Sequence, residues 1–394
     1  MQTTANVPRP RGSVWTDPKI RAWLFQIIAV IAVVAFGWYL FNNTQQNLAA
    51  RGIISGFSFL NSSAGFGIAQ HLIDYNESDS YGRVFVIGLL NTLLVSVIGI
   101  VFATIIGFIL GVARLSPNWL ISKLATVYIE TFRNIPPLLQ IFFWYFAVML
   151  AMPGPRQSME LGGTFFLNNR GLYLPAPIAT EAFVPFLLAL LLTLVGIVLL
   201  VRWGRARFEV TGKPFPLLLS SLALLVAIPG IAILLAGNPL SWSLPELTGF
   251  NFRGGWVLIP ELIALVLALT IYTAAFIAEN VRSGIQAVSH GQTEAARSLG
   301  LKPGITLRKV IIPQALRVII PPLTSQYLNL AKNSSLAAGI GYPDMVSLFA
   351  GTVLNQTGQA IEAIAITMSV YLAISLSISM LMNWYNKRMA LVER

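Results

Sequence analysis

The chain has 394 residues, of which 56% are hydrophobic and only 10% are charged. Soluble domains carry about 25% charged residues, so this composition indicates an integral membrane protein. The net charge of +11 comes from basic residues scattered through loops between apolar stretches, which favours a membrane surface over nucleic acid as the partner. With no cysteine and two histidines, disulfides, thiolate metal sites and multi-histidine metal sites are excluded.

Eight stretches are long or apolar enough to cross the membrane, because about 20 helical residues span roughly 30 Å of hydrocarbon. The third and seventh contain Pro-Pro pairs and several polar residues, so we expect a broken or re-entrant path in them. The sequence therefore predicts an all-α membrane protein with about eight transmembrane helices. They lie near residues 22–41, 84–112, 124–152, 183–201, 216–236, 256–280, 316–340 and 360–384.

The distribution of lysine and arginine predicts the orientation of these spans. Nineteen basic residues fall on the side that holds both termini, five fall on the other side, and Arg133 and Lys332 lie inside spans. Both termini and the loop that follows the sixth span are therefore expected in the cytoplasm. The first apolar stretch is longer than the 7 to 15 residues of a secretory signal and lacks a clear small-x-small cleavage site, which favours a retained anchor.

The second span carries small or weakly polar residues at four-residue spacing, which allows another helix to approach closely. Two interpretations remain open, namely tight packing within the chain and an interface with another subunit. The residues are Gly88, Thr92, Ser96, Gly99, Ala103, Gly107 and Gly111.

Two short segments bring charged residues close to predicted spans. Glu130 and Arg133 are three residues apart, so on a helix they can form a structural ion pair. Tyr272, Phe276 and Glu279 share one helical face, where Glu279 either lines a polar route or pairs with Arg282 at the interface.

The loop after the sixth span predicts a short helix over 290–299. Ser289 and Gln292 have the spacing of a capping box, and Gly300 suits the C-terminal cap. Pro303 can begin a second short helix that runs toward Pro313. Two small helices at an angle make a rigid protrusion, which we interpret as a docking element for a partner outside the membrane.

The seventh span is unusually polar, and Ser325, Asn329 and Lys332 fall on one stripe. These side chains, with the neighbouring Asn333 and Ser335, offer donors and a positive charge that would suit the carboxylate of an amino acid. The alternative is that they hydrogen-bond to neighbouring helices while Lys332 extends toward the interface.

The loop sequence Gly291 to Gly300, followed by Val310 to Ala315, resembles the EAA loop of ABC importer permeases. Three further segments, 130–140, 278–285 and 332–336, resemble the polar amino-acid uptake group of these permeases, in the same order. The resemblance covers roughly 84–152 and 256–384, and it implies a type I (MetI-like) permease core with a cytoplasmic coupling helix. Asn333-Ser334 departs from the Asp-Thr that is common in relatives.

The resemblance also divides the chain into four segments. Residues 1–83 would hold the cytoplasmic tail, an extra anchor helix and a periplasmic loop, and 84–152 would form the first part of the permease core. Residues 153–255 would be an inserted block with two extra transmembrane helices, and 256–394 would complete the core with the EAA loop. With these additions the chain is similar to the Q-type permeases of general L-amino-acid transporters.

The resemblance also implies that the chain works as part of an assembly with several other proteins. It implies a second permease subunit in a heterodimer, two ATP-binding subunits, a periplasmic amino-acid-binding protein and an L-amino acid substrate, in a bacterial inner membrane. Glu294, Ala295, Ala296 and Gly300 would seat the coupling helix in the ATPase. The chain itself would hold no cofactor, with ATP and Mg²⁺ on the partner, since Gly212-Lys213 is followed by Pro214 and no phosphate-binding loop is found.

Two other classes of protein remain as alternatives. An ion-coupled secondary amino-acid transporter would show carboxylates near the membrane midplane and two repeated halves. A channel would show rings of residues that form a selectivity filter. A purely structural scaffold subunit would not need the polar stripe of the seventh span.

Overall fold

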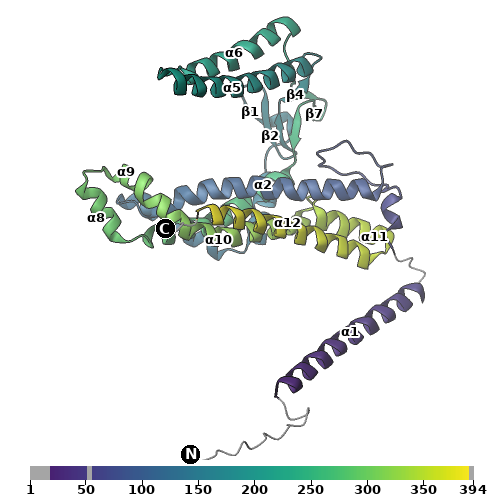
Figure 1. Cartoon of the computed structure of the whole chain (residues 1–394). Helices are drawn as coiled ribbons and strands as arrows, with labels where there is room; N and C mark the ends of the chain where they lie inside the picture. Colours follow the sequence, from purple (N-terminus) through teal and green to yellow (C-terminus); the bar gives the residue numbers. More distant parts are fainter. Residues whose placement is uncertain (1–17, 51–55, 390–394) are drawn as a thin grey trace, which may run out of the picture.

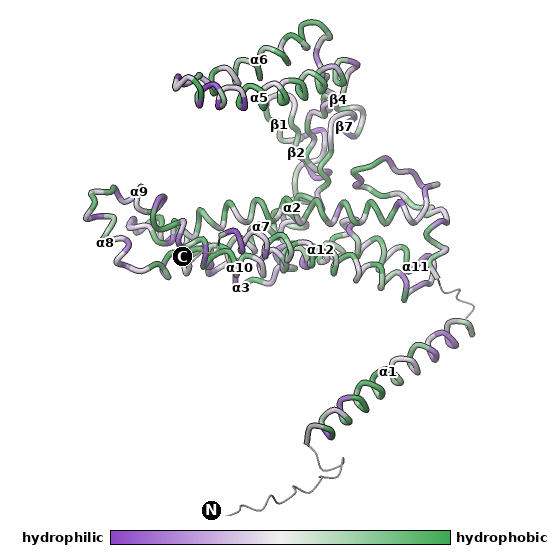
Figure 2. The backbone as a smooth tube through the Cα atoms, in the orientation of Figure 1, coloured by the Kyte–Doolittle hydropathy of each residue, from purple (hydrophilic) through white to green (hydrophobic). Residues whose placement is uncertain are grey.

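The molecule is a mostly helical bundle with a helical hairpin displaced to one side (Figure 1). The computed structural model describes residues 18–50 and 56–389. Within these ranges, six helices are long and apolar enough to cross a membrane, and Figure 2 shows hydrophobic residues along their lengths. They are α1 (Pro18–Ala50), α2 (Tyr81–Arg114), α5 (Phe183–Thr211), α6 (Leu217–Ala236), α7 (Pro260–Gln286) and α12 (Ala360–Met389).

The third predicted span is broken, as its prolines predicted. It consists of α3 (Trp119–Asn134), α4 (Pro137–Phe142) and the π-helical turn η2 (Phe143–Met149). Ile135 and Pro136 between them have extended backbone angles, because each precedes a proline and the proline ring disfavours the helical conformation of the residue before it. Asn118 caps α3, since its side-chain oxygen accepts hydrogen bonds from the amides of Leu120 and Ile121.

The seventh predicted span is interrupted at a different place. Helix α10 (Ile312–Asn333) continues through Pro321 and Pro322, and the chain changes to the 3₁₀ turn η5 (Ser334–Ile340) only after Asn333. The buried Ser334 hydroxyl donates to the carbonyl of Ala331 at 2.8 Å, a local bond that competes with regular helix. The π-helical turn η6 (Val346–Val353) and α11 (Leu354–Thr357) then lead into α12.

The fold is mostly helical, as predicted, and the block 153–255 adds short strands that the sequence did not predict. In the described part of the chain, eight short strands form a four-stranded antiparallel sheet, in the order β1-β2-β3-β8, and the antiparallel pairs β4–β5 and β6–β7. Figure 1 shows these strands between the α5–α6 hairpin and the core. They are β1 (Met159–Leu161), β2 (Phe165–Asn168), β3 (Gly171–Leu174), β4 (Ala176–Ala179), β5 (Leu240–Ser243), β6 (Glu246–Thr248), β7 (Asn251–Arg253) and β8 (Trp256–Leu258).

The remaining elements are short. Two 3₁₀ turns lie in the loops, and a helix-rich protrusion follows α7 at the end of the bundle opposite to α11 (Figure 1). The loop turns are η1 (Ser58–Asn61) and η3 (Pro155–Gln157). The protrusion consists of α8 (His290–Ser298), α9 (Pro303–Thr306) and the π-helical turn η4 (Leu307–Ile311).

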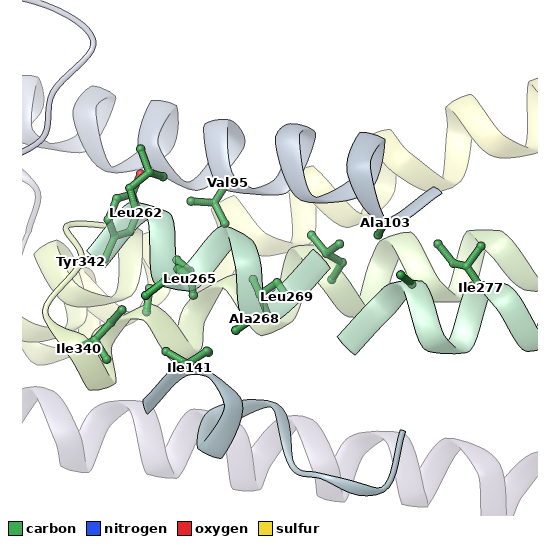
Figure 3. Packing of buried hydrophobic residues seen from close by; sticks show 14 of the residues in the cluster. Val95, Ala103, Ile141, Leu262, Leu265, Ala268, Leu269, Ile277, Ile340 and Tyr342 are labelled. Atoms are coloured by element: carbon green, nitrogen blue, oxygen red, sulfur yellow. The ribbon is translucent and has the colours of Figure 1, made fainter. Parts of the chain in front are cut away.

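Helix α7 is the centre of the core. Its apolar stretch is 61% buried, whereas α1 is not buried at all and α5 and α6 are almost fully exposed. Figure 3 shows Leu265, Ala268 and Leu269 of α7 near Ile141 of α4 and Val95 of α2. The bundle is therefore built around one buried helix, with α1, α5 and α6 left on the outside.

The small residues of α2 face this central helix. A Cβ atom added at Gly107 would lie 2.6 Å from Cβ of Ile277, and one added at Gly111 would lie 2.6 Å from Cβ of Val281. At the other end of α2, Gly88 and Gly99 lie against Met345 and Leu330 of the same chain. These contacts confirm the interpretation of the stripe as packing within the chain.

Replacement of Gly107 by alanine tests this packing. We expect Gly107→Ala to lower the free energy of unfolding by about 1–3 kcal/mol, because the added methyl group overlaps Ile277 and the carbonyl of Ala274. Gly196→Ala in α5 is the control, since nothing lies within 4 Å of its added Cβ. The measurement is the midpoint of thermal unfolding in detergent, and equal midpoints for the two variants would contradict the packing.

Candidate functional site

The protrusion after α7, residues 289–311, is here called the tip. Helix α8 begins after Ser289 as predicted, but no side-chain capping bond forms, so the predicted capping box is wrong. The backbone carbonyl of Ser289 instead accepts from the amide of Gln292 at 3.0 Å. The Gln292 side-chain oxygen faces Gln314 and accepts from its Nε2 at 3.2 Å, which joins α8 to the start of α10.

Gly300 ends α8 in the left-handed conformation, with φ of +75°. The amide of Leu301 donates to the carbonyl of Ala296 at 3.1 Å, and the amide of Gly300 donates to Arg297 at 2.8 Å, which is the pattern of a glycine C-cap. Pro303 occupies the first turn of α9, and the amide of Thr306 donates to the carbonyl of Lys302 at 2.9 Å. The predicted roles of Gly300 and Pro303 at the end of α8 and the start of α9 are thus confirmed.

The surface of the tip differs from the predicted docking set in one residue. Glu294 and Ala295 are exposed, and the Glu294 carboxylate lies 3.1 Å from Nδ1 of His290. Ala296 is only 3% exposed because it faces the rest of the tip, so it supports the protrusion from inside. The sequence did not single out Leu299, the C-cap residue that follows α8, which is a large apolar side chain with 79% exposure.

A cavity of about 820 Å³ lies between the tip and the turn that joins α2 to α3. Val112 of α2 and Pro117 of the α2–α3 turn line it on one side, and Arg297 and Thr306 of the tip line it on the other. The tip follows α7 in the chain and leads through η4 into α10, against which η4 packs.

The polar stripe of the seventh predicted span lies on α10 and faces away from the chain's own core. Ser325, Asn329 and Lys332 are all exposed. No salt bridge involving Lys332 forms within residues 18–50 and 56–389. Asn333 and Ser335 are half-buried, and the Ser335 hydroxyl donates to the carbonyl of Lys332 at 2.7 Å, so it is less available to a ligand.

The two predicted path residues on α7 have different surroundings. Tyr272 is half-buried, with its ring 4.9 Å from that of Phe276. Glu279 lies in an ion-pair cluster at the end of α7 next to the tip, where it contacts Arg114 and Arg282. Within the described residues, no hydrogen bond or ion pair joins Glu279 to the stripe on α10, and its pairing with arginines at the end of α7 favours the interface interpretation.

This charge cluster consists of Arg114, Glu130, Glu279 and Arg282. One guanidinium, that of Arg114, donates to both carboxylates, with Nη1 2.8 Å from Oε2 of Glu279 and Nη2 2.9 Å from Oε1 of Glu130. Arg282 binds the same Glu279 from one helical turn further along. The side chains of Arg114, Glu279 and Arg282 are only 20–27% exposed, so their contacts are less screened than surface pairs.

The predicted structural ion pair between Glu130 and Arg133 does not form. Glu130 is held by Arg114, and the Arg133 guanidinium instead lies over the ring of Phe276, 5.3 Å from its centroid. The stacking is a cation–π contact that keeps the arginine beside an apolar helix. Spacing along one helix predicted Arg133 as the partner of Glu130, whereas its partner in the fold is Arg114, at the end of α2.

A second polar cluster, absent from the sequence reading, ties α2 to the turn between η5 and η6. The buried Asn91 amide donates to the carbonyls of Gln70 and Pro343 at 2.8 and 2.9 Å. Asp344 is fully buried and accepts from the amide of Ser347 at 2.8 Å and from the hydroxyl of Tyr371 at 2.9 Å. These bonds satisfy the backbone where the chain leaves the helical path inside the bundle.

Comparison with known proteins gives consistent results. Residues 213–391 match the family described as "Binding-protein-dependent transport system inner membrane component". The chain is 63% identical over 388 residues to YhdX of Escherichia coli strain K12, which is named as an amino-acid ABC transporter permease, with 98% of each chain covered. It is 50% identical over 382 residues to the general L-amino acid transport system permease protein AapQ of Rhizobium johnstonii, covering 97% of this chain and 95% of AapQ.

A third relative has a narrower name. The chain is 44% identical over 409 aligned positions to BztB of Rhodobacter capsulatus, with 96% of each chain covered. BztB is named as a glutamate, glutamine, aspartate and asparagine transport system permease protein.

Removal of the shared arginine tests the charge cluster. Arg114→Met leaves Glu130 and Glu279 without their common partner, and a half-buried carboxylate without a partner is costly, so we expect a loss of stability of about 2–4 kcal/mol. Lys387→Met at the exposed end of α12 is the matched control. Thermal unfolding in detergent measures the effect, and Arg114→Met behaving like its control would contradict the bridging role.

Proposed function

Because the chain belongs to the family of permease proteins of amino-acid ABC transporters, we propose that it is the transmembrane subunit of an ATP-driven importer of L-amino acids. The observation that carries this proposal is the rigid tip, which presents Glu294, Ala295 and Leu299 to the solvent at one end of the bundle. A protrusion of this kind offers a docking surface through which an ATPase subunit outside the membrane can displace the membrane helices.

The proposed partners follow from this arrangement. Two ATP-binding subunits dock at the cytoplasmic face, with ATP and Mg²⁺ bound on them, since this chain has no phosphate-binding loop. A second, different permease subunit completes the translocation path, and a periplasmic amino-acid-binding protein delivers the substrate. The chain itself is not an enzyme.

In the proposed orientation the tip and both termini lie in the cytoplasm of a bacterium, and the chain crosses the inner membrane several times. The excess of lysine and arginine on the side of the tip supports this topology. The β-structure of the inserted block then lies in the periplasm. It is connected to the start of α5, the end of α6 and the start of α7, which are the ends that lie across the membrane from the tip in this topology.

The proposed mechanism has two stages. Closure of the ATPase subunits on ATP moves the two tips, and each tip moves its membrane helices as a rigid body, which favours one orientation of the path over the other. Gly300 gives the tip its fixed end, and Ala296 packs it from inside, so that displacement of α8 is passed to α7 and α10.

The exposed stripe on α10 is the proposed contribution of this chain to the path. Ser325 and Asn329 offer hydrogen bonds, and the ammonium group of Lys332 attracts the carboxylate that every amino acid carries. A site that recognises this shared group would tolerate many side chains, as expected for a broad L-amino-acid importer. Tyr272 and Asn333 are secondary candidates for the path.

Variants of the tip test the proposed function. In proteoliposomes that hold the complete assembly, we expect Glu294→Lys to reduce ATP-driven uptake and substrate-stimulated ATPase activity at least tenfold, because it reverses the charge presented to the ATPase. Glu246→Lys, an exposed change in β6, should leave both activities unchanged. Gly300→Ala should impair coupling because alanine is strained at positive φ, whereas Gly300→Asn should retain more of it.

Two outcomes would contradict the proposal. Normal stimulated ATPase activity in Glu294→Lys would remove the coupling role of the tip. Uptake by this chain alone, driven by a proton or sodium gradient without the ATPase, would show a secondary transporter instead.

Replacement of Lys332 tests the proposed path. We expect Lys332→Ala to raise the KM for neutral and acidic amino acids alike, by about tenfold, because a hydrogen bond to a charged group contributes roughly 1.5–3 kcal/mol. Lys123→Ala on the exposed face of α3 is the control. Uptake kinetics in proteoliposomes measure the effect, and unchanged kinetics would assign Lys332 to the membrane interface.

A further inference from the structure

A long apolar groove runs between α2 and α12, with a volume of about 720 Å³. The α2 side extends from Phe85 to Ile100 and the α12 side from Ala365 to Leu381, which corresponds to about 22–24 Å at 1.5 Å per helical residue. Most of a hydrocarbon layer about 30 Å thick is therefore matched by this groove.

The groove is shaped for a helix. On α12 its wall is formed by Ala365, Ser369, Ala373 and Ser377, small residues at four-residue spacing that let another backbone come close. The hydroxyl of Ser377 donates to the carbonyl of Ala373 at 2.8 Å, within its own helix. On the α2 side, the hydroxyl of Ser96 donates in the same way to the carbonyl of Thr92 at 2.7 Å. The lining contains no charged residue, so the matching occupant is apolar.

Helix α1 is tethered at the mouth of this groove. The amide of Gly56 donates to Oε1 of Glu362 at 2.7 Å, at the start of α12, and Phe57 is itself part of the groove lining. Helix α1 ends at Ala50, so at most six Cα-to-Cα steps separate its end from Gly56, a reach of about 20 Å. The connection holds the end of α1 near one end of the groove.

The apolar stretch of α1 is not buried against any other part of the described chain. Its side chains are exposed on all faces from Ile20 to Phe41, including Trp23, Phe25 and Phe36, and Figure 1 shows it extending away from the bundle. An apolar helix of this length beside an apolar groove of matching length gains van der Waals contacts by entering it.

We propose that α1 packs lengthwise into the groove between α2 and α12, antiparallel to both. The last part of α1, from Asn42 to Ala50, then extends beyond the groove, and Phe41 lies at the depth of Phe57 and Ala365. Counting down both helices from there, Gly37 lies beside Ser369 and Val33 lies beside Ala373. The extra N-terminal helix thus covers the outer face of the α2–α12 pair.

Cysteine cross-linking tests the proposal directly, because the chain contains no cysteine. In membranes that hold the complete assembly, Ser369→Cys is combined with one cysteine at a time from Val33 to Gly37, and a second series pairs Ala373→Cys with positions one turn deeper in α1. After oxidation, mass spectrometry of the linked peptides identifies the partner residue. Met368→Cys is the control, since it has the same depth on α12 but points outside the groove and is 67% exposed.

The expected result is a link within the chain at positions that recur every three to four residues of α1. Its yield should be at least fivefold above that of the Met368→Cys control, and the second series should shift by one turn. Two results would overturn the proposal. In the first, no links to α1 form, and Ser369→Cys reacts with a lipid-soluble maleimide as fast as Met368→Cys does. This result would place lipid in the groove. The other is a link from Ser369→Cys to a cysteine of the second permease subunit, which would place that subunit there.

Discussion

The close approach of α2 to α7 is the contact on which the rest of the structure depends. Gly107 and Gly111 let the two helices meet with almost no side chain between them, against Ile277 and Val281. Where the glycines end, Arg114 continues the contact as a charged bridge to Glu279 and to α3. The tip begins three residues after α7 ends, so the same contact connects the tip to the core.

Helix α10 extends this connection to the proposed path. Its first turn receives the tip through η4 and the bond between Gln292 and Gln314, and its buried side packs on α7 and on Gly99 of α2. The opposite side carries the exposed stripe of Ser325, Asn329 and Lys332. Helix α10 thus joins the tip, where the ATPase is proposed to act, to the residues that are proposed to contact the substrate.

Features that depend on neighbouring residues could be predicted from the sequence. Gly300 and Pro303 define the ends of the short helices of the tip, the four-residue spacing on α2 predicted close packing, and the stripe on α10 is exposed as a stripe. Features that depend on distant residues could not. Arg114 lies 16 residues from Glu130 and 165 residues from Glu279, on a different helix from either, so spacing along one helix assigned Glu130 to Arg133 instead. The strands of the inserted block have only three or four residues, which is too short for an alternating pattern to be detected.

The proposed mechanism requires the tip and the α2–α7 pair to move as one body. Spin labels at Leu299→Cys and Ile109→Cys, both exposed positions in a chain without native cysteines, report the distance between them by pulsed electron paramagnetic resonance. In the assembled, transport-competent complex, we expect the same distance distribution with and without bound ATP. A shift of several ångströms on ATP binding would show that the tip moves independently of the helices, which rules out movement as one body.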